Sequence, residues 1–221
     1  QVKAYLPLKE KARDGKGTMY LFAGLPKTAE FEKVTDAILK SNVNVAGYAL
    51  LPVEGASLAE KLVKTVYKGD KDALDARWTV LVSEHKTGGL RQIVINNGEL
   101  ALTRLTPLGE EHMGQPTPNI EQDIISEFDA TLTYLARFGY MQGQPLNLIV
   151  ICSDEVGEKL QKANLPVSNL KTIRAGKAAE AVGLKYFERH DEHHTADILH
   201  AAWAGSRKAT MPMTMPALEK V

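Results

Sequence analysis

The chain has 221 residues and balances 27 Lys and Arg against 27 Asp and Glu, so its formal net charge at pH 7 is zero. Hydrophobic residues make up 44% and charged residues 24%, a composition that excludes disorder over the whole length. A neutral surface argues against general binding to nucleic acid or anionic lipid, and one cysteine excludes both an internal disulfide and a zinc site built from several cysteines.

The first third of the chain alternates between strand and helix patterns. Residues 1–18 are polar and basic and predict a lead-in loop. The apolar run at 19–25 predicts a buried strand, and 43–51 predicts another. Capping residues Thr28 and Ser57 each predict the start of a helix, the second as a capping box with Glu three residues later.

A charged, glycine-containing stretch at 68–75 predicts a boundary. Residues 1–76 are therefore expected to form a small β-α-β-α accessory subdomain, and residues 77–210 a second unit. Within that unit three strands are expected, with Asn96-Asn97-Gly98 forming a tight hairpin turn. These strands are placed at 78–83, 91–95 and 100–105.

The rest of the second unit predicts helices alternating with strands. A long helix is expected from Asn119, because apolar residues recur there every three or four positions. The apolar strand at 146–152 is expected to be buried on both faces. Three further helices and two short strands follow, at 154–163, 175–182 and 195–204 and at 171–173 and 184–187. Residues 211–221 predict a linker.

The order β-β-β-α-β-α-β-α over 77–204 resembles the ribonuclease H-like fold, which also forms each half of actin-like ATPases. The hairpin LRQIVINNGELALTRLT at 90–106 is similar to that of the PilM/GspL group, actin-like proteins of type IV pilus and type II secretion assembly. The pattern Ile124-Ile-Ser-Glu127-Phe128 looks like the group's long helix, and 197–216 resembles the stretch before the membrane-proximal end of its bitopic members. The resemblance implies an α/β fold with an actin-like mixed sheet and flanking helices.

Actin-like ATPases hold ATP and Mg²⁺ between two such halves, and the resemblance places one phosphate turn at 83–89. If a nucleotide binds, Lys86, Thr87, Gly88 and Gly89 would cradle it. Ser83, however, stands where that pattern has an Asp, and residues 1–76 are too few for a first half. A degenerate nucleotide site, no cofactor and no catalysis are therefore expected, and an ordinary hairpin loop is the favoured interpretation of the turn.

Other candidate chemistries depend on acidic and histidine residues. A two-metal nuclease of this fold would gather carboxylates at strand ends. The candidates are Glu84, Asp154, Asp191, Asp197, Glu121, Asp123 and Glu127. With Ser83 at the expected acid position and no basic surplus, solvated loop acids are the favoured interpretation. His190 and His194 are candidate zinc ligands if their segment is helical, although acidic residues there equally favour a helix start.

Three side chains have structural interpretations beside functional ones. Cys152 lies in an apolar strand and is expected to be buried rather than nucleophilic. Trp78 and Trp203 fit either the core or an interface.

The favoured hypothesis is a non-catalytic scaffold in a type IV pilus or type II secretion assembly platform, at the cytoplasmic face of the inner membrane. Its expected partners are other assembly proteins, with a homodimer or a docked partner peptide as further expectations. No nucleic acid is expected, and a membrane only through a segment beyond Val221. Two alternatives stay open: an actin-like ATPase using the 83–89 turn, and a divalent-metal nuclease.

Overall fold

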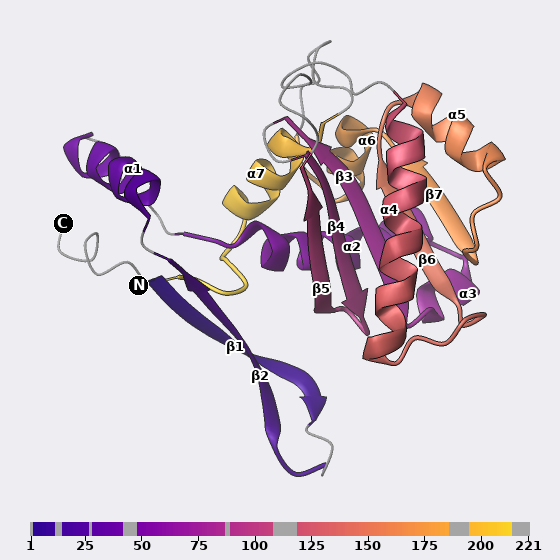
Figure 1. Cartoon of the computed structure of the whole chain (residues 1–221), viewed down its shortest axis with the longest axis horizontal. Coiled ribbons are helices and arrows are strands. Elements are labelled where there is room, and N and C mark those ends of the chain that lie inside the picture. Colours follow the sequence, from indigo (N-terminus) through magenta and orange to yellow (C-terminus); the bar gives the residue numbers. More distant parts are fainter. Residues whose placement is uncertain are drawn as a thin grey trace.

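A five-stranded mixed sheet forms the centre of the protein (Figure 1). The structure, a computed structural model, describes residues 2–11, 15–26, 28–41, 48–86, 89–107, 119–185 and 195–213. The strands are β3 (Trp78–His85), β4 (Gly89–Asn96), β5 (Glu99–Thr106), β6 (Leu146–Ile151) and β7 (Asn169–Ile173). They lie in the order β5-β4-β3-β6-β7, antiparallel from β3 to β5 and parallel from β3 to β7. The predicted mixed α/β class and the five matching strands are confirmed.

Helices cover both faces of this sheet, which makes a three-layer body (Figure 1). One face carries α2 (Leu51–Val66), α6 (Ala175–Ala181) and α7 (Asp197–Gly205), and the other carries α4 (Ile120–Leu135) and α5 (Asp154–Lys162). The short α3 (Lys71–Asp75) and the 3₁₀ turn η2 (Ala136–Phe138) complete the body. In the described part of the chain, no helix has the length and apolar character needed to cross a bilayer.

Strand alternation explains how one sheet supplies two hydrophobic cores. Along β3, Leu81 points into the core beneath α2 and α7, while Val80 and Val82 point into the core beneath α4. Gly55 brings α2 close to the sheet, because a Cβ atom there would overlap Cδ1 of Ile93. The central strands β3 and β6 are buried along their whole length.

A second, separate sheet has only two strands, β1 (Val2–Lys11) and β2 (Thr18–Leu25), and we call it the ribbon. The ribbon projects from the body, followed by α1 (Ala29–Lys40) (Figure 1). The predicted loop at 1–18 was wrong for the residues of β1. Val2, Ala4, Leu6 and Leu8 alternate with other residues, which is a strand pattern that the basic character of the segment obscured.

The region between α1 and the sheet also differs from its prediction. Helix α2 begins at Leu51, with Pro52 in its first turn, rather than at Ser57. Of the predicted strand at 43–51, residues 42–47 lie outside the described residues, and Tyr48 forms only an isolated bridge. The predicted subdomain boundary lay after residue 76, but α2 packs into the same core as β3, β4 and β6.

The end of the described chain folds back on the body. Met211 and Met213 of the predicted linker are buried, and Met213 bridges Tyr48, whereas 214–221 lie outside the described residues. Both tryptophans belong to the core. The predicted strand at 184–187 is absent at 184–185, and its other two residues are not described.

Candidate functional site

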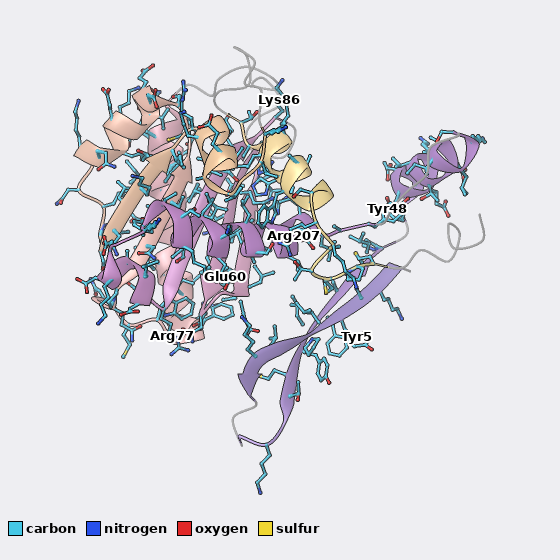
Figure 2. The ribbon with its side chains drawn as sticks, turned by 180° about the vertical axis from the view of Figure 1, so that it is seen from behind. Tyr5, Tyr48, Glu60, Arg77, Lys86 and Arg207 are labelled. Atoms are coloured by element: carbon cyan, nitrogen blue, oxygen red, sulfur yellow. The ribbon has the colours of Figure 1, made fainter. Side chains whose placement is uncertain are left out.

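The turn between β3 and β4 meets the start of α7 at one end of the sheet. Figure 2 shows Lys86 at this end, beside α7. Lys86 and Gly89 belong to the described residues, whereas Thr87 and Gly88 of the predicted phosphate turn lie outside them. The geometry of the turn can therefore be followed from its two flanks.

Three side chains form a hydrogen-bonded chain there. Ser83 and His85 are two residues apart on β3 and so share the face beneath α7, with 3.1 Å between Oγ and Nε2. Nδ1 of His85 lies 3.2 Å from Oδ1 of Asp197 on α7. Because a carboxylate only accepts hydrogen bonds, Nδ1 of His85 donates to Asp197, and Nε2 shares a hydrogen bond with the Ser83 hydroxyl.

Asp197 connects this chain to the turn itself. Its Oδ2 accepts a 2.9 Å hydrogen bond from the backbone N–H of Lys86, and next to it the N–H of Ala196 donates to the carbonyl of Glu84. Burial alone would raise the pKa of Asp197, but the hydrogen bonds from His85 and Lys86 outweigh it, and the pKa lies below its usual value. An internal carboxylate thus occupies an anion position at the turn.

His200 lies behind His85, one helical turn beyond Asp197. The two imidazole centroids are 5.1 Å apart, and among the described residues Nε2 of His200 has no hydrogen-bond partner. Burial, with smaller contributions from neighbouring His85 and Arg91, lowers the pKa of His200 to about 3. The imidazole of His200 is therefore neutral at physiological pH.

The order serine, histidine, aspartate matches the connectivity of a nucleophile, a base and its orienting group. The Ser83 side chain, however, belongs to a residue only 1% exposed and points beneath α7. A substrate carbonyl cannot reach Oγ in this conformation. The chain's effect is structural: it ties α7 to the end of β3.

A pocket of about 240 Å³ lies on the opposite face, between the carboxyl ends of β3 and β6 and the first turns of α4 and α5. Glu84, Glu121 and Lys159 line it together with apolar residues. Lys159 Nζ lies 3.4 Å from Glu121 and 3.2 Å from Glu155. A lysine ammonium thus pairs with Glu121 and Glu155 where a nuclease would place a metal ion.

The remaining predicted acids do not converge. Asp197 faces the other side of the sheet, and Glu127 pairs with Arg104 of β5 at 2.9 Å. Asp154 and Asp123 do not line the pocket. Within the described ranges no group of three acidic, histidine or cysteine side chains can hold a metal ion. Asp191, His190 and His194 lie outside those ranges.

Cys152 is buried at the end of β6, as predicted. Burial, together with the nearby charge of Asp154, raises the pKa of its thiol to about 12. The thiolate is therefore scarce at neutral pH, and Cys152 is not an activated nucleophile.

Sequence reasoning missed two groupings. Asp197 was considered as a metal ligand, but its contact with His85 spans 112 residues and has no local signature. The second grouping is a trio of exposed aromatic residues on the ribbon, Tyr5, Tyr20 and Phe22. The alternation of apolar residues over 2–8 could have identified β1, and with it the strand pair on which the three aromatic residues lie.

No protein-family model matches the chain, and no curated protein matches it significantly.

Proposed function

We propose that the chain is a non-catalytic scaffold domain with a ribonuclease H-like, actin-like fold. It would act through protein–protein contacts in a type IV pilus or type II secretion assembly platform, at the cytoplasmic face of the inner membrane. Other assembly proteins, and in a homodimer a second copy, would be its partners. The fold, the occupied turn and the exposed ribbon each support a part of this proposal.

The strand order supports the fold assignment. Three antiparallel strands are followed by a long helix, and β6 then pairs in parallel with β3, the first strand of the sheet. The ribonuclease H-like fold has this connectivity. The resemblance of the 90–106 hairpin and of the α4 sequence to the PilM/GspL group supplies the assignment to an assembly platform.

The hydrogen bond from Lys86 N–H to Asp197 is the observation that carries the non-catalytic part. A phosphate turn works through backbone N–H groups that point at the ligand. Here the carboxylate of Asp197 accepts a hydrogen bond from one of those groups, the backbone N–H of Lys86. A nucleotide phosphate would have to displace that carboxylate and overcome its repulsion.

Neither alternative gains a supporting observation from the described residues. An ATPase using the 83–89 turn would need Asp197 to withdraw. A nuclease would need Lys159 to leave Glu121, because the ammonium competes with Mg²⁺ for the same carboxylate. Both alternatives therefore require rearrangement, whereas the scaffold requires none.

Calorimetry with Mg-ATP tests the proposal against the ATPase. We expect no saturable heat from the wild-type chain. Saturable micromolar binding that weakens in Lys86→Ala, but not in the control Lys71→Ala on α3, would contradict the scaffold. A two-hybrid screen against inner-membrane proteins of pilus and secretion platforms tests the positive claim, and we expect at least one reproducible interaction.

A further inference from the structure

Three aromatic rings lie exposed on one face of the ribbon, and we call Tyr5, Tyr20 and Phe22 the aromatic face. Their residues are 68%, 46% and 75% exposed. Tyr5 and Phe22 are direct partners across the two strands, and the three ring centroids lie 6.0–6.3 Å apart. The rings therefore form one continuous surface, and Figure 2 shows Tyr5 on the ribbon, away from the sheet.

The other face of the ribbon is partly covered. Ala4 and Leu25 pack with Phe31 of α1, with Tyr48 and with the buried Met213. Small and aliphatic residues on this face are therefore half-buried, whereas the three aromatic rings of the opposite face are exposed. Contiguous exposed aromatic surface of this kind marks interaction sites, where such rings supply most of the binding energy.

A groove of about 650 Å³ continues the aromatic face, lined by residues that include Lys3, Tyr5, Phe22 and Pro212. Lys3 lines the groove, and the other charged residue of β1 and β2 whose side chain the structure describes is Lys9, which is also basic and exposed. An occupant with complementary charge is therefore acidic.

The ribbon also has edges that can accept a strand. The described part of its sheet contains only β1 and β2, so each strand has one edge that pairs with no other described strand. An extended peptide can add to such an edge through its backbone and place alternate side chains on one face.

We propose that the aromatic face and its groove bind an extended, acidic segment of a partner protein. Apolar side chains of the segment pack on Tyr5 and Phe22, and its carboxylates pair with Lys3 and Lys9. The inference rests on the proposed scaffold function and specifies where a partner docks. Aromatic and basic residues also suit single-stranded nucleic acid, but the zero net charge of the chain disfavours that ligand.

Selection from a random peptide library displayed on phage, with the whole chain as bait, tests the proposal. We expect enrichment of peptides that combine Asp or Glu with aliphatic or aromatic residues. The dissociation constant of a synthetic enriched peptide is then measured by fluorescence anisotropy. Phe22→Ser and Tyr5→Ser should each raise it at least about tenfold, the loss typical of a central aromatic anchor.

Two further variants separate specific docking from general stickiness. Lys3→Glu should weaken binding and reduce its dependence on salt. Val34→Ser removes a side chain from an equally solvent-facing position on α1, 56% exposed, and should leave the dissociation constant unchanged. Because all four side chains are exposed, each variant should keep the wild-type circular dichroism spectrum and unfolding curve.

Several outcomes would overturn the inference. These are enriched peptides without acidic residues, peptide binding that Phe22→Ser leaves intact, or tighter binding of fluorescent oligo(dT) at the aromatic face. A dimer in sedimentation velocity that Phe22→Ser dissociates would instead assign the face to a second copy. Peptides that bind elsewhere on the chain would contradict this docking site but not the proposed scaffold function. Binding of Mg-ATP would contradict the scaffold function but not the docking site.

Discussion

The body buries most of its large apolar side chains, whereas the ribbon exposes several of its own. In the body, Phe128 of α4 is fully buried between the helix and the sheet. On the ribbon, Phe22 is 75% exposed. The exposed phenylalanine belongs to the element richer in apolar residues, because β2 has six of eight and α4 has eight of sixteen, so composition does not account for the difference.

The difference follows from the number of layers. The five-stranded sheet has helices on both faces, and each strand can bury its side chains on either side. The ribbon has its own chain on one face only, and a two-stranded sheet is marginally stable by itself. The body is therefore complete as a folded unit, whereas the ribbon presents a surface suited to a partner.

The largest expected effect comes from truncating the buried phenylalanine. Phe128→Ala should lower the free energy of unfolding by about 3–5 kcal/mol, because it leaves a cavity in a packed core. Phe22→Ala should change it by less than about 0.5 kcal/mol, as for an exposed side chain. Urea unfolding followed by circular dichroism measures both. Equal losses would show that the ribbon is part of the same cooperative core.

A close helix–sheet contact should give the next largest effect. Gly55→Ala places a methyl group where Ile93 already lies, and overpacking should cost about 1–3 kcal/mol. Gly205→Ala in α7 is the matched control, because a Cβ there meets nothing within 4 Å. If both substitutions are equally tolerated in thermal unfolding, α2 does not pack on β4 as described.

The contact between α7 and the strand-end turn should have a smaller effect. Asp197→Ala removes hydrogen bonds to His85 and Lys86, and we expect a loss of about 1 kcal/mol, reduced by solvent screening because the side chain is 38% exposed. Glu158→Ala, at an exposed position of α5, is the control and should leave the free energy of unfolding unchanged. Since the folded pKa of Asp197 is depressed, its contribution is present above pH 3.8 and lost as pH falls through the folded pKa. Denaturant titrations at pH 7 and pH 3 measure this.

The smallest effect at neutral pH is expected for His200. His200→Leu removes a buried nitrogen that has no partner among the described residues, so stability at pH 7 should be unchanged or slightly higher. Its folded pKa of about 3 lies below the ordinary 6.5, so the unfolded state binds more protons between these values. The stability of the wild type should thus decrease as the pH is lowered from 6.5 towards 3, by up to about 1.4 kcal/mol per pH unit. If the free energy of unfolding of His200→Leu depends on pH as steeply as that of the wild type, His200 is not the group responsible for that dependence.

The body was largely predictable because its signals are local. The apolar run at 146–152 and the turn at Asn97-Gly98 lie within single elements, and the structure has β6 and the β4–β5 hairpin there. The ribbon was partly missed because the basic and polar residues of the first 18 positions outweighed the apolar alternation of β1. Ser57 resembles a helix cap, yet it lies inside α2, where its hydroxyl donates to the carbonyl of Glu54 and accepts from Trp203.

Residue order alone indicated the α/β class, most strands and helices, and the burial of Cys152, because short-range periodicity reports which faces of an element avoid water. Folding in three dimensions decided the rest. It brought Asp197 to His85 and Lys86, aligned Tyr5 with Phe22 and placed α2 against the sheet. Such contacts depend on how elements pack and on strand register, and residues far apart in the chain leave no periodic trace of either.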